Sequence, residues 1–313
     1  MRAATRTQAD VVCLSAGGVS VVLDIADAAP PAIVYWGEDL GPTTVDDLEV
    51  LRRHAVAPRV ADGVDAGIRL GVLPEPARGW YGRPGIEGHR DGTASVQRFH
   101  LVDQRRSDSS WTGVLGADAG LTVRVEIELT DEGLLRQRAS VRNSTTTRYH
   151  LNAVTLSAPV PPHASEVLDL MGSHMRERHP QRAHWDIGQR VHESRRGRPG
   201  LQSTTFIAVG EPGFSFASGE VWCVHVAWSG NNRMLAEHTS AGHKHLMGGE
   251  LLLPGEVILE PSQEYVSPWV FFAWGRGLDD LSRRFHRWLR RRPGRSRRPR
   301  PVTVDRVRPQ PSR

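Results

Sequence analysis

Cysteine and lysine are almost missing from this sequence of 313 residues. The two cysteines, Cys13 and Cys223, are too few for a disulfide framework, and they exclude a zinc site built from cysteines. We expect both to be small buried hydrophobes in apolar strands. Lys244 is the only lysine, so arginine carries nearly all of the positive charge.

Long apolar runs are also missing. No stretch approaches the run of about eighteen apolar residues that a membrane span needs. Met1 to Asp10 is polar and lacks the apolar segment of a signal peptide. With 39% hydrophobic and 24% charged residues, the composition is that of a globular protein with a sizeable core. We therefore expect a cytoplasmic protein with no membrane partner.

Acidic residues are scarce near the end of the chain. Residues 283–313 hold thirteen arginines and a single acid, Asp305. Since the whole chain carries a formal charge of +5 and this segment +12, residues 1–282 carry −7. Nucleic-acid binding would rest on this segment alone, and because it has no recognisable motif we expect no nucleic-acid partner. Residues 293–313 can bury too little apolar surface to offset chain entropy, so we predict a disordered basic tail.

Apolar and polar residues alternate through most of residues 11–160. The pattern is clearest in Leu121 to Thr130, and the turn Asp131-Glu132-Gly133 leads into a second strand, Leu134 to Asn143. We expect further strands at 11–15, 18–25, 31–36, 96–103, 111–116, 149–156, 166–171, 203–209, 213–217, 221–228, 233–238, 244–253, 256–260 and 266–273. The charge-rich residues 172–200 are expected to be a loop. The pattern predicts an all-β fold, a large antiparallel sandwich of two stacked sheets.

Helical spacing appears late in the chain. Apolar residues recur there at intervals of three and four, namely Leu278, Leu281, Phe285, Trp288 and Leu289. They predict one amphipathic helix of about twelve residues. At Val45 to Arg53, a short helix and a loop are both compatible with the sequence. We divide the chain into a β-sandwich domain (1–277), a linker helix (278–292) and the tail (293–313).

Residues 79–90 are unusually rich in glycine, aromatic rings and guanidinium groups. Four glycines and a proline predict a loop with positive φ angles that a strand or helix would not tolerate. Flat apolar faces and hydrogen-bond donors suit the binding of a polar ring. The residues that offer them are Trp80, Tyr81, Arg83, His89 and Arg90. The alternative is an arginine-rich surface turn with a packed tryptophan.

Motifs for catalysis or metal binding are missing from the sequence. There is no Gly-x-Ser-x-Gly elbow, no phosphate loop and no His-Glu-x-x-His, and no pair of carboxylates stands out. For His238, His243 and His245 we prefer a hydrated hairpin to a metal site. His184-Trp185-Asp186 lies in the polar loop and is interpreted as a structural turn. We expect no catalytic residue, no metal and no cofactor.

Several segments together resemble the N-terminal domain of the α-galactosidases of glycoside hydrolase family 36. Their order and spacing over residues 11 to about 304 carry the resemblance. The segments are Pro31 to Gly41, Gly82 to Arg90, Glu193 to Gly197, Gly230 to Asn232, Gly249 to Glu256, Tyr265 to Val270 and Phe285 to Arg290.

The resemblance implies a β-supersandwich of the galactose-mutarotase type. In that family a (β/α)8 barrel follows and carries both catalytic aspartates, and the reaction is retaining hydrolysis of terminal α-galactosides, as in raffinose-type oligosaccharides. Arg300 to Val304 resembles the lead-in to the first barrel strand, but Asp305 to Arg313 replaces that strand. We therefore expect a product truncated before the barrel and inactive alone.

The resemblance also assigns a role to residues 80–90. In the family's oligomers a loop of this domain reaches the sugar pocket of a neighbouring subunit. By position this implies substrate binding by Trp80, Arg83, His89 and Arg90, with Trp80 over a sugar face, in a homo-oligomer or beside a separate barrel polypeptide. Two alternatives stay open: a stand-alone carbohydrate-binding module, and a non-functional fragment left by a frameshift.

Overall fold

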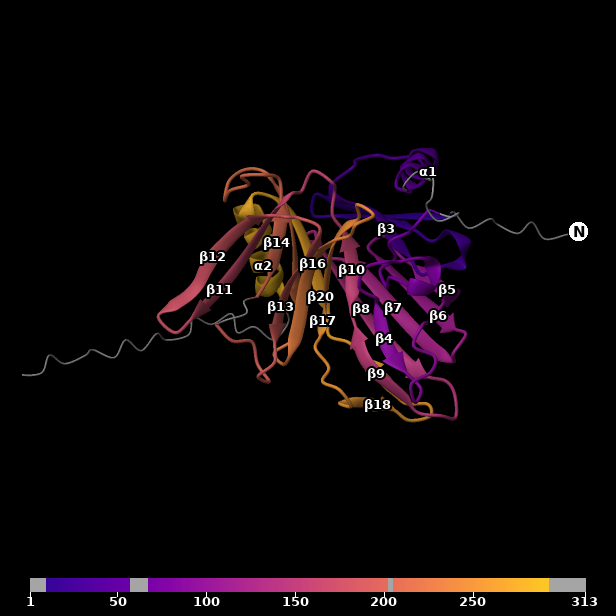
Figure 1. Ribbon diagram of the computed structural model, residues 1–313. Helices are drawn as coiled ribbons and strands as arrows, with labels where there is room; N and C mark the ends of the chain where they lie inside the picture. Colours follow the sequence, from indigo (N-terminus) through magenta and orange to yellow (C-terminus); the bar gives the residue numbers. More distant parts are fainter. Residues whose placement is uncertain (1–9, 57–66, 202–204, 293–313) are drawn as a thin grey trace, which may run out of the picture.

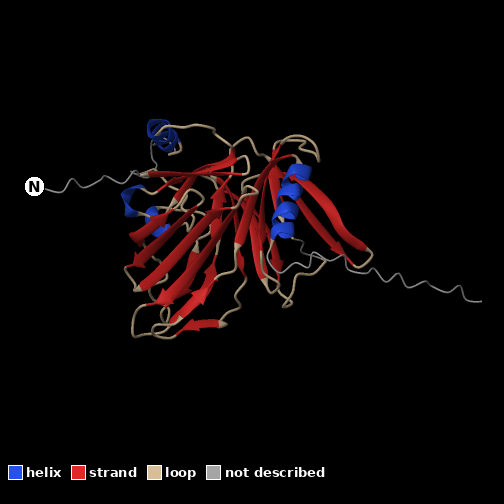
Figure 2. Ribbon diagram, turned by 180° about the vertical axis from the view of Figure 1, so that it is seen from behind, coloured by secondary structure: helices blue, strands red, loops and turns tan. Residues whose placement is uncertain are grey.

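The computed structural model describes residues 10–56, 67–201 and 205–292 (Figure 1). In these residues all strand pairings are antiparallel, and the strands form four sheets accompanied by two α-helices (Figure 2). The predicted all-β fold is confirmed. No helix in the described part of the chain is long and apolar enough to cross a membrane.

A 10-stranded sheet is the centre of the fold. Its strands, in the order in which they pair, are β12 (Arg176–His184), β11 (Glu166–Ser173), β14 (Ile207–Gly210), β15 (Glu220–Val226), β20 (Val270–Arg276), β8 (Leu134–Asn143), β7 (Leu121–Leu129), β6 (Ser110–Ala117) and β5 (Phe99–Arg106), with β19 (Glu264–Val266) pairing beside β8. The predicted hairpin at residues 121–143 is present as β7 and β8, with Leu129 opposite Leu135 next to the turn.

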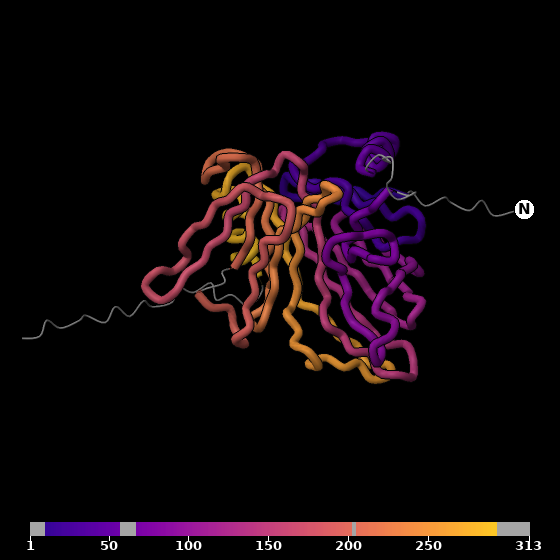
Figure 3. The backbone as a smooth tube through the Cα atoms, viewed as in Figure 1, coloured from indigo at the N-terminus to yellow at the C-terminus, as the bar shows by residue number. Residues whose placement is uncertain are grey.

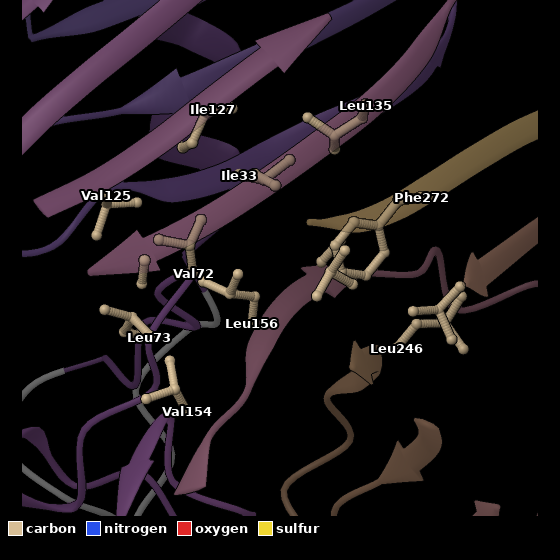
Figure 4. Close-up of a cluster of buried hydrophobic side chains, with 14 of the residues drawn as sticks. Ile33, Val72, Leu73, Val125, Ile127, Leu135, Val154, Leu156, Leu246 and Phe272 are labelled. Carbon is tan, nitrogen blue, oxygen red and sulfur yellow. The ribbon is translucent and has the colours of Figure 1, made fainter. Parts of the chain in front are cut away.

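Three smaller sheets cover one face of the large sheet. They consist of β1 (Val11–Ala16), β2 (Val19–Asp24) and β3 (Ala32–Glu38); of β10 (Leu156–Pro159), β17 (Lys244–Glu250), β16 (Asn232–His238) and β13 (Gly188–Ser194); and of β18 (Val257–Leu259), β9 (Tyr149–Val154) and β4 (Ile86–His89). Two 3-10 turns, η1 (Ala26–Ala28) and η2 (Pro76–Arg78), lie in the connections. The facing side chains form one core, in which Ile127 and Phe272 of the large sheet are joined by Ile33, Leu156 and Leu246 of the smaller ones (Figure 4).

The late helix is present as predicted, and residues 45–54, where a helix and a loop were both compatible with the sequence, are also helical. For α1 (Val45–His54), the structure decides between the helix and the loop, because Thr44 and Asp47 form a capping box. The late helix, α2 (Leu278–Arg291), packs on the other face of the large sheet (Figure 2). Its Trp288 ring lies 4.8 Å from the ring of Phe271 on β20. The division into domains stays a prediction, and residues 293–313 lie outside the described residues.

Some strand predictions were wrong. The loop predicted at 172–200 contains β12 and β13. Every residue of β12 is exposed on the projecting β11–β12 hairpin (Figure 3), so no buried face produces an alternating pattern. In β13 the buried residues include the polar His192 and Ser194, which hides the same signal. Conversely, residues 213–217 form turns and bends rather than a strand.

The two cysteines differ in burial. Cys223 on β15 is fully buried, as expected, and burial raises the pKa of its thiol to about 12. Cys13 on β1 is only half-buried, contrary to expectation. It lies at the margin of a small apolar cluster in which Leu48 of α1 contacts β1 and β2.

The interpretation of residues 79–90 as a pure loop was also wrong. Residues 86–89 form β4, which pairs with β9. Of the four glycines only Gly79 has a positive φ, of 82°. A Cβ on Gly88 would lie 2.5 Å from the carbonyl oxygen of His150 and 2.6 Å from the ring of Tyr149. The glycine is there to permit close packing, which turn chemistry alone did not predict.

We predict that Gly88→Ala lowers the free energy of unfolding by about 3 kcal/mol, because the added methyl group must displace the backbone of β9. Gly116→Ala on β6 is the matched control, since its Cβ would meet only Val102 at 3.4 Å, an ordinary contact. Urea unfolding of both variants measures the difference. Equal stability of the two variants would contradict the close-packing account.

Candidate functional site

The segment that contains the predicted sugar-binding residues packs on the sheet of β16 and β17. The ring of Trp80 stacks on His243 with a centroid distance of 5.4 Å, and meets His245 edge-on at 5.1 Å. Trp80 is only 5% exposed, and its Nε1 donates a hydrogen bond to the carbonyl oxygen of Arg83 at 3.0 Å. The indole therefore anchors the segment, and His243 occupies one of its faces.

A buried carboxylate on the underlying sheet, that of Glu237, binds the same segment. Glu237 on β16 accepts hydrogen bonds from the backbone N–H of Arg83 (3.0 Å) and from Nε2 of Gln189 (2.7 Å). Nε2 of His245 on β17 lies 3.0 Å from its Oε2. A Cβ on Gly82 would lie 2.6 Å from the same oxygen, so this glycine permits the close approach. The carboxylate thus joins the segment to β13, β16 and β17.

Burial and hydrogen bonding act in opposite directions on this carboxylate. Burial alone would raise the pKa of Glu237, but the contacts with His245, the Arg83 N–H and Gln189 outweigh it and lower the pKa to about 2. Burial lowers the pKa of His245, which is fully buried, and Glu237 offsets part of that change. The hydrated hairpin predicted for His238, His243 and His245 is therefore wrong: the hairpin exists, but His245 lies in its buried face.

Arg83, His89 and Arg90 have separate surroundings. A terminal nitrogen of Arg83 lies 2.7 Å from Oε1 of Glu87, and the arginine side chain is 22% exposed. The ring of His89 stacks on His150 at 5.0 Å. These two side chains keep some exposure to solvent.

Arg90 ties several turns together. Its guanidinium donates hydrogen bonds to the carbonyl oxygens of Ala119 and Thr147 and to Oδ1 of Asn143, and it lies over the ring of Tyr149 at 5.2 Å. With these partners the group fixes the end of the large sheet against β9.

The four residues fall into two pairs rather than one cluster. Trp80 and Arg83 contact Glu237 and the β16–β17 hairpin, whereas His89 and Arg90 lie against β9. A cavity of about 260 Å³ opens beside the segment, lined in part by Glu75, Pro84, Glu87, His89 and Asn152. The role in sugar contact assigned to the four residues stays a prediction.

Sequence reasoning missed a group of polar residues at the loop end of the β14–β15 hairpin. Nitrogen or oxygen atoms of His163, Glu211 and Glu220 lie within 4.8 Å of one another. The hairpin register brings the two acids together, which their separation in sequence does not reveal.

The sequence His184-Trp185-Asp186 connects β12 to β13. Trp185 is 3% exposed and packs in the main core, and Nε2 of His184 lies 3.8 Å from Oδ1 of Asp186 at the surface. The interpretation as a structural turn agrees with this geometry.

We predict that Glu237→Gln lowers the free energy of unfolding by about 2 kcal/mol at pH 7, because two hydrogen-bond donors lose a buried charged acceptor and His245 loses its charged neighbour. The folded pKa lies below the ordinary value of 4.5, so the charged form stabilises the fold. That contribution is complete above pH 4.5 and is lost as the pH falls towards 2. Between pH 4.5 and 2, urea unfolding should show a larger loss of stability in the wild type than in the variant, in which other carboxylates of lowered pKa, such as Asp169 and Glu193, still titrate.

The matched control is Glu87→Gln, which neutralises a partly exposed carboxylate in the same segment. Its effect should stay below about 1 kcal/mol, as for surface ion pairs. A Glu237→Gln variant as stable as this control would show that the buried carboxylate does not hold the segment.

The chain is similar to proteins of known activity over most of its length. Residues 29–260 match the glycosyl hydrolase family 36 N-terminal domain. Over 262 residues, the chain is 33% identical to an α-galactosidase of Escherichia coli. The aligned residues cover 82% of this chain and 36% of that protein. It is 31% identical to the α-galactosidase Mel36A of Lactobacillus acidophilus over 144 residues, which are 45% of this chain and 20% of that protein. The matched part of the chain thus spans about a third of the first relative's length and a fifth of the second relative's length.

Solved structures share the fold. The α-galactosidase AgaA of Geobacillus stearothermophilus, in a variant complexed with raffinose, superposes with a TM-score of 0.79 and 21% identity, over 90% of this chain and 43% of that one. An α-galactosidase from Lactobacillus brevis gives a TM-score of 0.75 and 15% identity, over 88% and 40%. From the match over residues 29–260 and the identity to the E. coli protein, we conclude that the chain belongs to glycoside hydrolase family 36 and corresponds to the N-terminal domain of its α-galactosidases.

Proposed function

We propose that this chain serves an α-galactosidase, which hydrolyses terminal α-galactosides, and that it contributes assembly and the rim of the sugar pocket rather than the catalytic acids. The observation that carries the proposal is the family match over residues 29–260. The 33% identity to the E. coli α-galactosidase over 82% of the chain supports the same activity.

The proposed substrates are raffinose-type oligosaccharides. Structures of AgaA variants from Geobacillus stearothermophilus, which share this fold, were determined in complex with raffinose and with stachyose. A galactose ring offers hydroxyl groups to polar side chains and an apolar face to aromatic rings. Protein groups at a pocket rim act by orienting such a ring.

The four predicted substrate-binding residues would share this task unequally. Arg83 and His89 keep some exposure and carry hydrogen-bonding groups, so we assign direct sugar contact to them. Tyr81, which is 58% exposed, adds an aromatic face beside Arg83. Trp80 and Arg90 would act by positioning, because their rings and donors already contact the protein.

The partner at this rim would be a second subunit of a homo-oligomer or a separate polypeptide that carries a catalytic barrel. A rim segment serves such an interface only if it keeps its shape without the partner. The buried hydrogen bonds of Glu237 and Trp80 support this, because they fix the segment within the domain. The cytoplasmic location expected from the sequence stays a prediction.

Titration of the purified chain with raffinose and assay with a chromogenic α-galactoside test the proposal. We expect no hydrolysis and no binding up to about 10 mM sugar, because a rim alone buries too little of the ligand. A cooperative urea transition must accompany the titration, since it shows that the chain is folded. Millimolar binding would favour a stand-alone carbohydrate-binding module, and hydrolysis that persists after repurification would contradict the proposal outright.

The rim itself can be tested in a chimera in which residues 29–260 replace the matching segment of the E. coli α-galactosidase. Arg83→Ala should raise KM for raffinose about tenfold at an unchanged kcat, the loss of about one charged hydrogen bond. Arg52→Ala on α1 removes an arginine of similar exposure that lies in the ion pair with Glu49 and should leave KM unchanged. Equal KM values for the two variants would remove Arg83 from the rim.

A further inference from the structure

A second polar site lies beside Trp36, at the loop end of the β14–β15 hairpin. A cavity of about 320 Å³ opens there, between β3, the connection from β10 to β11, and the start of β15. Glu211 directly follows β14, Glu220 begins β15, and His163 comes from the β10–β11 connection. Two distant segments of the chain therefore bring an imidazole and two carboxylates to one wall of this cavity.

The three side chains are held by groups outside the trio. Nε1 of Trp274 donates a hydrogen bond to Oε1 of Glu220 at 3.0 Å, which leaves Oε2 of Glu220 3.2 Å from Nε2 of His163. The imidazole ring lies edge-on to the buried ring of Trp222, with centroids 5.5 Å apart. Metal-binding proteins use such outer partners to orient their ligands.

Glu211 is fixed by the hairpin itself. Its Oε2 accepts a hydrogen bond from the backbone N–H of Glu220 at 2.9 Å, while its own N–H donates to the carbonyl oxygen of Glu220 at 3.1 Å. The other carboxylate oxygen has no hydrogen bond or ion pair among residues 10–56, 67–201 and 205–292. It is therefore available to a further ligand.

Negative charge exceeds positive charge around the cavity. Glu38, Glu211 and Glu220 line it, and Arg276 is the one guanidinium among the described lining residues. The guanidinium is paired with Glu38 at 2.6 Å and attracts Glu220 and Glu211 more weakly, so one positive charge faces three carboxylates. A bound cation would offset the repulsion between those two carboxylates.

We propose that His163, Glu211 and Glu220 bind a divalent cation of the zinc type, with the remaining coordination positions open to the cavity. One imidazole nitrogen and two carboxylate oxygens suit Zn²⁺, whereas Ca²⁺ takes six to eight oxygen ligands. In a tetrahedral site with ligand atoms about 2.1 Å from the ion, those atoms stand about 3.4 Å from one another. The ligand atoms of the trio lie up to 4.8 Å apart, so side-chain rotations that move each atom by about 1 Å would bring them to that spacing. The half-exposed His163 has room for them.

The cation would replace the contact between His163 and Glu220 by two bonds to one ion. It would also link the β10–β11 connection to the β14–β15 hairpin, two segments joined there by a side-chain contact at the surface. The site stands apart from Trp80, Arg83, His89 and Arg90, so it does not depend on the sugar-binding role proposed for them.

Titration of the EDTA-treated full-length chain with ZnCl₂ at pH 7.5, followed by calorimetry, tests the site. We expect one site in the wild type that His163→Ala, Glu220→Gln and Glu211→Gln each weaken by at least about tenfold. The control is His184→Ala, which removes an exposed histidine of a similar pair with Asp186 and has no third ligand. It should bind as the wild type does.

Urea unfolding in EDTA gives the metal-free midpoint of each variant, which keeps the test independent of folding. Added Zn²⁺ should raise the midpoint above its own EDTA value for the wild type and His184→Ala only. Zinc binding by His163→Ala equal to that of the wild type would overturn the proposal, as would its absence in the wild type at micromolar Zn²⁺. If Ca²⁺ displaced Zn²⁺ at equal concentration, the ion would be bound by the carboxylates without the histidine, and the proposal would again be overturned.

Discussion

The strands at the centre of the large sheet carry apolar residues on both faces, and each face has to be kept from water. In β15, Trp222 and Val224 belong to the main core, and Val221 and Cys223 belong to a second cluster on the other side. Three small sheets cover the first face and α2 covers the second. The placement of the small sheets and of α2 follows from that requirement, because an uncovered face of this kind would drive association.

The candidate rim, residues 79–90, depends indirectly on the small sheet that contains β16 and β17. The sheet of β16 and β17 can present a polar patch only because its opposite face is packed in the core, where Ala236 and Leu246 are fully buried. Glu237 and His245 then lie at low exposure and act as a rigid platform for residues 79–90. The segment is held in place by contacts within the domain. This suits a binding surface, because a surface that is ordered before the partner arrives loses less entropy on binding.

Prediction from the sequence succeeded where one face of a strand is apolar and the other is polar. Leu121 to Asn143 shows this, and so does the 3.6-residue spacing of α2. It failed for β12, which has no buried face, and for Gly82 and Gly88, whose role is to let Glu237 and β9 approach. The trio of His163, Glu211 and Glu220 was out of reach, because only strand pairing brings its members together. Family resemblance supplied the remainder: no local pattern points to a galactoside.

One feature of β12 affects how copies of this protein meet in solution. The strand ends the large sheet, and among the described strands only β11 pairs with it. An open edge of this kind is a template for strand addition and amyloid-like stacking. Pro180 lies within the strand and lacks an N–H, and Arg176, Arg178 and Arg182 surround it with positive charge. The edge strand thus carries its own protection against aggregation, because it also lacks large apolar residues.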